Sequence, residues 1–310
     1  MSSPESYPEP DQLGHLPSAD SLRARIVRAA AAALTDARTA AATAAEDPDA
    51  AVHAVRKSLR QLRALVDLVA RTLPKRDRVD LQRGLAEARR SLGPARDQRV
   101  ARELLATLGP LHELTPAVES IDATAAADRI PPETIVDDVQ RAVAVAAGHV
   151  DALTAALPDE LRPRRLARGF AKTYGRARAA RKRSKRSDRA VHRFRRRAKE
   201  LAYQLAIIDV LPDTADWRDG LRALDDQLGP VVDHLMAKDY VRAYGGGSEG
   251  TTAVLAAVHD GLLAGKDAAR RGSKAMFKPR PKTLRERMTS ALAASVAQTD
   301  VAEHDPGDTD

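Results

Sequence analysis

Two segments of the chain place a histidine and several cationic side chains at helical spacing. In the first segment, His53, Arg56, Arg60 and Arg63 follow one another at intervals of three and four residues, so they share one face of a helix. A guanidinium group presents several N–H donors in a fixed fork, and phosphoryl oxygens each accept several charge-assisted hydrogen bonds. The pattern therefore indicates recognition of an anionic, phosphate-like ligand.

The second segment repeats this arrangement with His192, Arg195 and Lys199, and Tyr203 follows one turn later. Each cationic stripe lies one position from an apolar seam, and the seams consist of Val52, Val55, Leu59, Leu62, Val66 and Val69 and of Val191, Phe194, Ala198, Leu201, Leu205 and Ile208. Adjacent positions lie about 100° apart on a helix, so we expect each stripe to form a groove wall beside the core. A single histidine at such a position is more often a structural ring. The recurrence with arginine neighbours favours ligand binding.

The net charge of +8 is unevenly distributed along the chain. Residues 162–199 contain 18 Lys and Arg against one acid, Asp188, so this window carries +17 and the rest of the chain carries −9. Apolar residues at helical spacing interrupt the window, which favours a folded pair of basic helices over a solvated linker. Such a local field implies a polyanionic partner, which could be a nucleic acid, an anionic membrane or a phosphate polymer.

Composition restricts the architecture that positions these stripes. The chain has 310 residues, of which 43% are hydrophobic and 3% aromatic, and it has no cysteine. Few aromatic residues argue against a β-sandwich, and the lack of cysteine excludes disulfides, thiolate metal sites and a cysteine nucleophile. No apolar run is long enough to span a membrane, and the first residues lack the features of a signal peptide. We expect an all-α cytoplasmic protein.

Proline, glycine and capping residues divide the sequence into helical segments. Loops are expected at 110–131 and 245–250, and disordered tails at 1–19 and 300–310, the latter acidic. The expected helices span residues 21–45, 48–73, 76–92, 94–108, 133–157, 159–183, 188–211, 214–228, 230–244, 252–270 and 282–297.

An internal repeat relates two parts of the chain. AVHAVRKSLRQL at 51–62 matches AVHRFRRRAKEL at 190–201, and LQRGLAEARRSLGPARD at 81–97 matches WRDGLRALDDQLGPVVD at 217–233. Two matched blocks in the same order indicate duplication. The prediction is a pair of pseudo-symmetric antiparallel helical bundles within 20–299, the first at about 20–130 and the second at about 131–299.

These matched segments resemble the recurring motifs of the CHAD family, the histidine-containing α-helical domain. The resemblance rests on VHAVRKSLRQLRAL at 52–65, VHRFRRRAKELAYQL at 191–205, and the Leu-Gly-Pro blocks at 92–97 and 228–233, and it covers roughly 20–270. It implies two pseudo-symmetric helical bundles around a basic central channel that binds inorganic polyphosphate. It also implies association with polyphosphate granules.

The resemblance places the channel-lining residues on both stripes and on the helix before the second stripe. On that helix the cations step by three and four residues and can share a face, and the equivalent helix of the first half offers Arg25, Arg28 and Arg38, diluted by alanines. We therefore expect a channel that is more positive on the side of the second half. The polyphosphate-binding residues implied are His53, Arg56, Arg60, Arg63, Arg165, Arg168, Lys172, Arg176, His192, Arg195, Arg196, Lys199, Tyr203, Arg25 and Arg28.

Other classes of function fit the sequence less well. The stripes contain no paired acids, nucleotide-binding loop or metal-binding motif, so we expect neither catalysis nor a cofactor. Sequence-independent binding of a nucleic-acid backbone is the main alternative, although single-strand binders stack bases on aromatic residues. Here the basic region offers only Phe170, Tyr174, Phe194 and Tyr203, and the two phenylalanines fit the core better. A basic scaffold that docks an acidic protein or a membrane ranks last, and the oligomeric state stays open.

Overall fold

The computed structural model describes residues 21–111 and 113–303, and within them all regular structure is helical, which confirms the predicted all-α class. The tail expected at 1–19 lies outside the described residues, as does most of the tail expected at 300–310. The elements are α1 (Leu22–Ala42), α2 (Pro48–Leu68), α3 (Lys75–Ser91), α4 (Gly93–Leu111), α5 (Thr115–Thr124), the 3₁₀ helix η1 (Ala125–Asp128), α6 (Pro132–Ala156), α7 (Pro163–Arg183), α8 (Asp188–Ile208), α9 (Thr214–Tyr244), α10 (Glu249–Gly272) and α11 (Pro281–Glu303).

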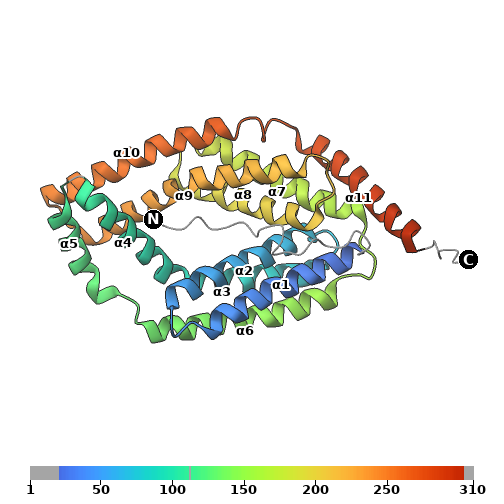
Figure 1. Ribbon diagram of the computed structural model, residues 1–310, viewed down its shortest axis with the longest axis horizontal. Coiled ribbons are helices and arrows are strands. Elements are labelled where there is room, and N and C mark those ends of the chain that lie inside the picture. Colours follow the sequence, from blue (N-terminus) through green and yellow to red (C-terminus); the bar gives the residue numbers. More distant parts are fainter. Residues whose placement is uncertain (1–20, 112, 304–310) are drawn as a thin grey trace, which may run out of the picture.

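The helices form two groups that meet along α2 and α8. Figure 1 shows α1, α2, α3 and α6 on one side of the molecule and α7, α8, α9 and α10 on the other, with α4 and α5 at one end. Helix α2 packs against α7 and α8, and α4 packs against α9. The two helices that carry the cationic stripes are therefore neighbours.

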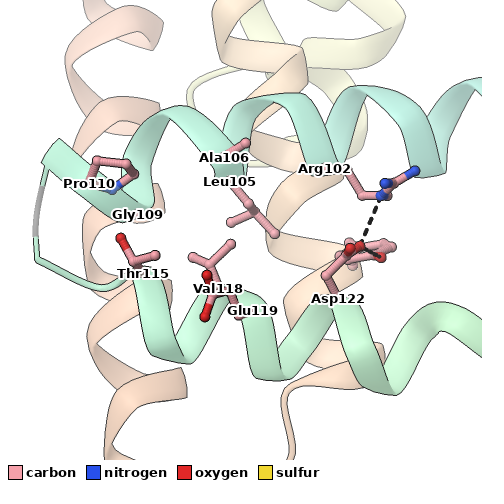
Figure 2. A pocket seen from close by; sticks show the side chains of 10 residues that line it. Arg102, Leu105, Ala106, Gly109, Pro110, Thr115, Val118, Glu119 and Asp122 are labelled. Carbon is pink, nitrogen blue, oxygen red and sulfur yellow. Dashed lines mark hydrogen bonds and ion pairs between the residues drawn. The ribbon is translucent and has the colours of Figure 1, made fainter.

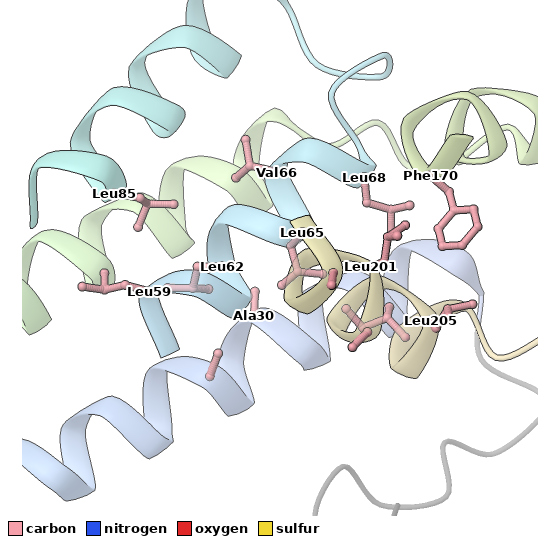
Figure 3. Packing of buried hydrophobic residues seen from close by; sticks show 14 of the residues in the cluster. Ala30, Leu59, Leu62, Leu65, Val66, Leu68, Leu85, Phe170, Leu201 and Leu205 are labelled. Carbon is pink, nitrogen blue, oxygen red and sulfur yellow. The ribbon is translucent and has the colours of Figure 1, made fainter. Parts of the chain in front are cut away.

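The apolar seams of α2 and α8 form the centre of the main core (Figure 3). Leu59, Leu62 and Leu65 of α2 and Leu201 and Leu205 of α8 are at most 1% exposed. Burying one such side chain contributes roughly 1.5–3 kcal/mol to stability. This packing fixes the rotation of both helices and thereby the direction in which the neighbouring cationic stripes point.

A close helix contact sets how α7 lies against α2. A Cβ on Gly169 of α7 would stand 1.9 Å from the carbonyl oxygen of Leu68, so only glycine permits this approach. Phe170 beside it is fully buried, as Phe194 of α8 nearly is, which places both phenylalanines in the core as the sequence predicts. The basic helix α7 is thereby held against the end of α2.

Three expected boundaries differ from the structure. The segments expected as separate helices at 214–228 and 230–244 form the single helix α9, with Pro230 inside it. A proline in a helix interior costs about 3 kcal/mol or more, and here its apolar neighbours Leu228, Val231 and Val232 are all buried, which holds the helix together. The loop expected at 110–131 contains α5 and η1, because Ile121 and Ala125 pack into a second, smaller core with α9 and α10. Helix α11 also continues to Glu303.

Candidate anion-binding site

The stripes of α2 and α8 come together with cations from α3 and α4. Arg96 of α4 lies close enough to Arg60 and Arg195 for their positive charges to repel its own. Arg89 of α3 is repelled in the same way by Arg63, Arg60 and Arg196. We call this group the arginine cluster, and its members are His53, Arg56, Arg60 and Arg63 of α2, Arg89 of α3, Arg96 of α4, and His192, Arg195 and Arg196 of α8. Four helices thus converge on one half-buried concentration of positive charge.

Burial and mutual repulsion perturb the titration of the cluster. Burial, with the charge of Arg96, lowers the pKa of Arg56 to about 9, and burial with the charge of Arg63 lowers that of Arg89 to about 10. Burial and the charge of Arg60 lower the pKa of His53 to about 4, so this ring is neutral at pH 7. Burial also lowers the pKa of His192. Each shift shows that further positive charge is unfavourable here, and an anionic ligand would reverse this.

Three arginines of the cluster hold hydrogen-bond donors that the described residues leave unused. The Nε atoms of Arg63, Arg89 and Arg196 are buried without a hydrogen-bond partner in that part of the chain. A buried donor without a partner costs about 1–3 kcal/mol, and more on a charged group. Because these three arginines also lie within reach of each other's charges, the arrangement is suited to a ligand that accepts several hydrogen bonds and brings negative charge.

Other predicted site residues on α8 are engaged within the protein. Lys199 is 3% exposed, and its Nζ lies 3.0 Å from Oδ2 of Asp225, whose Oδ1 accepts a hydrogen bond of 2.9 Å from Nε of Arg195. Tyr203 is buried, and burial raises the pKa of its hydroxyl. Lys199 and Tyr203 are therefore buried and do not lie on the exposed side of the cluster. Both belong to the end of the stripe that enters the core.

The predicted stripe of α7 forms a second cationic group beside the end of α2. Arg165, Arg168 and Lys172 are exposed, and Nη1 of Arg165 donates to the carbonyl oxygen of Arg71 at 3.1 Å. Burial and the charge of Arg176 lower the pKa of Lys172.

Asp67 connects this second group with the cluster helix α8. Its carboxylate forms ion pairs with Nη1 of Arg176, at 3.5 Å, and with Nη1 of Arg197, at 3.3 Å. Of the two predicted residues on α1, Arg25 is buried and Arg28 is exposed. The cations predicted on α7 and on the stripes therefore form two neighbouring groups.

Sequence reasoning missed two members of the cluster, Arg89 and Arg96. Both belong to the block 81–97 that carries the first Leu-Gly-Pro motif. Gly93 of this motif stands beside Arg56, because a Cβ there would lie 3.7 Å from Nη1 of Arg56. Arg56 in turn donates to the carbonyl oxygen of Arg89 at 3.1 Å. The Leu-Gly-Pro motif therefore lies in contact with the stripe of α2. The arginines on either side of this motif in the sequence could have been predicted as members of the same site.

A pocket at the far end of the molecule has a different chemistry (Figure 2). It has a volume of about 290 Å³ and lies between α4, α5 and α9, with Leu105 and Val118 among its lining residues. Its main charged group, Asp122, already accepts a hydrogen bond from Nε of Arg102 at 2.9 Å and another from the hydroxyl of Tyr240. Among the described residues that line this pocket, the cation is Arg102, and it is already paired with Asp122.

Two kinds of feature are absent from residues 21–111 and 113–303. No helix in these ranges carries an apolar stretch of the length that a bilayer crossing needs. The same residues contain no group of three or more His, Asp or Glu side chains placed to hold a metal ion.

Comparisons with known proteins agree with the helical architecture. A family model described as the CHAD domain matches residues 25–211, which is more than half of the chain. The crystal structure of the CHAD domain from the plant Ricinus communis is similar in fold, with a TM-score of 0.56 and 21% sequence identity over 86% of this chain and 91% of that one. The comparison with curated proteins gave no match. On the family model and the shared fold, this chain belongs to the CHAD domain family.

Proposed function

We propose that the arginine cluster binds inorganic polyphosphate between α2 and α8. Membership in the CHAD family supports a polyphosphate-related role in general. The cluster adds a chemical reason, because a linear phosphate polymer presents oxygens along its whole length and has no bases or sugars to accommodate. A row of forked guanidinium groups matches such a ligand without any further recognition element.

The observation that carries the proposal is the set of buried Nε donors on Arg63, Arg89 and Arg196 that find no hydrogen-bond partner among the described residues. These side chains come from three helices, α2, α3 and α8, so no single surface helix accounts for the arrangement. Bound phosphoryl oxygens would accept these hydrogen bonds and offset the mutual repulsion of the arginines. Both effects favour binding over the ligand-free state.

The aromatic side chains disfavour nucleic acid as the ligand. Tyr174 is fully buried and Tyr203 is 5% exposed, and the two phenylalanines of the basic region lie in the core. None of the four presents a ring for base stacking, which gives single-strand binders about 1–3 kcal/mol per base. A phosphate polymer loses nothing by their burial.

We further propose that binding is not accompanied by hydrolysis. Two carboxylates beside the cluster are engaged with cations, since Asp225 contacts Arg195 and Lys199, and Asp97 lies 3.6 Å from Arg96. Release of orthophosphate from long-chain polyphosphate, measured with Mg²⁺ present, should equal that of a protein-free control. Release that scales with protein concentration would contradict this part of the proposal.

The first test is competition for the site. We expect long-chain polyphosphate to bind the full chain far more tightly than single- or double-stranded DNA at equal phosphate concentration. Even competition by DNA would contradict specific polyphosphate binding and favour a general polyanion surface.

A variant tests the place of binding. Replacing Arg63 and Arg196 by glutamine should reduce polyphosphate affinity about a hundredfold. This estimate assigns about 1.4 kcal/mol, or a factor of ten in affinity, to the charge-assisted hydrogen bonds of each arginine. Helix content should stay unchanged in circular dichroism, because neither Nε forms a hydrogen bond with any residue that the structure describes. Arg271→Gln with Arg280→Gln is the matched control, since both are exposed arginines away from the cluster. Equal affinity of the two double variants would overturn the assignment of the cluster.

A further inference from the structure

A separate pocket lies at the turn between α7 and α8. It has a volume of about 230 Å³, and its lining residues are Arg183, Arg186, Ser187, Arg189, Ala190 and Arg193. Four of the six are arginines, contributed by the end of α7, the turn and the first two turns of α8. Within the described residues none of these four side chains forms an ion pair with a carboxylate. The pocket is therefore a further concentration of guanidinium groups, distinct from the arginine cluster and from the stripe of α7.

The one acid of this turn is directed away from the pocket. Asp188 accepts hydrogen bonds from Lys238 of α9, at 2.6 Å, and from Lys266 of α10. Burial alone would raise the pKa of Asp188, but these two lysines lower it to about 2, so the carboxylate stays ionised and occupied. Asp188 is next to the pocket arginines in the sequence, but its carboxylate is bound to the two lysines and does not neutralise them.

One face of α8 connects the pocket with the arginine cluster. Arg189, Arg193 and Arg196 follow one another at intervals of four and three residues, so their side chains lie along the same side of the helix. The distance from Arg189 to Arg196 along the axis is about 10 Å at 1.5 Å per residue. The charge of Arg193 also acts on Arg196. A flexible polyanion that occupies the cluster can therefore continue along α8 into the pocket.

The corresponding turn before α2 has the opposite charge. This turn contains three acids, Glu46, Asp47 and Asp49. The side chain of Asp47 caps α2, because it accepts a hydrogen bond of 2.9 Å from the N–H of Ala50. At the start of α8, Ser187 makes no such side-chain cap. The positive surface thus extends beyond the cluster at the α8 end and is closed by acids at the α2 end.

We propose that the pocket of Arg183, Arg186, Arg189 and Arg193 binds the phosphoryl groups of a polyphosphate chain where it leaves the arginine cluster. This inference rests on the proposed function and deepens it, because it predicts a direction in which long chains extend. Short chains that fill only the cluster would not reach the pocket. The pocket should therefore contribute to the affinity for long chains and not to the affinity for short ones.

The experiment compares two probes, tripolyphosphate and long-chain polyphosphate, on the full chain and on Arg186→Gln with Arg189→Gln. We expect the variant to bind long chains at least tenfold more weakly and to bind tripolyphosphate as the unmodified protein does. The slope of log affinity against log salt concentration for long chains should fall by about two, roughly one for each lost phosphate contact. Both arginines are exposed, so the fold should be retained.

The matched control, Arg271→Gln with Arg280→Gln, removes the same charge elsewhere and should change neither affinity nor slope. Equal long-chain affinity of the pocket variant and the unmodified protein would overturn the inference while leaving polyphosphate binding intact. Equal losses in the pocket variant and the control would also overturn it, because net charge alone would then explain the effect. Failure of the unmodified protein to prefer polyphosphate over DNA would instead refute the proposed function.

Discussion

The stripes of α2 and α8 share their contacts but differ in how their charge is balanced. In each, a glycine of a Leu-Gly-Pro segment lies beside the second residue of the stripe: Gly93 beside Arg56 and Gly229 beside Arg195. On α8 the arginine donates to the carboxylate of Asp225, whereas on α2 it donates to the backbone carbonyl of Arg89. The same local geometry therefore supports a neutralised stripe and an unneutralised one.

A single aligned position accounts for much of this difference. When the blocks 81–97 and 217–233 are superimposed in sequence, Arg89 aligns with Asp225. Likewise Gln61 of α2 aligns with Glu200 of α8, which pairs with Arg197. Helix α8 is thus neutralised in part by two buried acids, its own Glu200 and Asp225 of α9, while the stripe of α2 has no carboxylate at the two aligned positions. The expectation that the second half is the more positive side of the channel stays a prediction, and these internal pairs reduce the charge on that side.

The largest expected effect is on stability and concerns the neutralised stripe. Asp225→Asn leaves Lys199 and Arg195 without their carboxylate, and both are largely buried. Breaking a buried ion pair from one side typically costs about 3–5 kcal/mol. We expect a loss of this size in the free energy of unfolding by urea. Asp226→Asn is the control, because Asp226 is exposed, and equal losses in both variants would contradict the assigned role of Asp225.

The next effect is on affinity and concerns the unneutralised stripe. Arg89→Asp introduces at α3 the carboxylate that α9 supplies to α8, so it should pair with the arginines of α2. We expect polyphosphate affinity to fall about a hundredfold, which corresponds to about 2.7 kcal/mol, with stability equal to or above that of the unmodified protein. Titration calorimetry and urea unfolding measure the two quantities.

The neighbouring exposed residue provides the control for this charge reversal. Arg90→Asp changes the net charge by the same amount outside the cluster and should weaken binding far less. A hundredfold loss in both variants would show that long-range charge, and not the balance at α2, governs affinity.

The sequence predicted the helical class and the two seams because apolar periodicity decides which face of a helix is buried. Leu59 and Leu201 are accordingly in the core. It could not predict which cations stay available, because the partner of Arg195 comes from α9, thirty residues further on. It also placed a break at Pro230, where tertiary packing overrides the local preference of proline. Sequence spacing alone predicts which residues belong to a stripe. Whether their charges are neutralised depends on acids from other helices that pack against the stripe, as Asp225 of α9 does against α8.

The smallest expected effect separates the two histidines by their pH dependence. Because the pKa of His53 is lowered to about 4, mainly by burial and then by Arg60, Arg96, Lys57 and Arg99, the unfolded chain binds a proton between pH 6.5 and 4 that the folded protein does not. Stability should therefore fall as pH falls through this range, with a slope of up to one proton, or about 1.4 kcal/mol per pH unit. His53→Gln should remove that part of the slope in urea unfolding between pH 5 and 7.

His192 should contribute less to this slope than His53. Burial lowers the pKa of His192 as well, but the carboxylates of Asp97, Asp239 and Asp188 oppose that shift, whereas the charges acting on His53 are all cations. His192→Gln should therefore flatten the dependence less than His53→Gln. Bound polyphosphate would raise the pKa of both rings, so its affinity should increase as pH falls from 7 to 5, and each histidine variant should lose part of that increase. Equal flattening of the stability dependence in the two variants would show that the acids near α8 do not reach its histidine, and the contrast in charge balance would then be confined to the arginines.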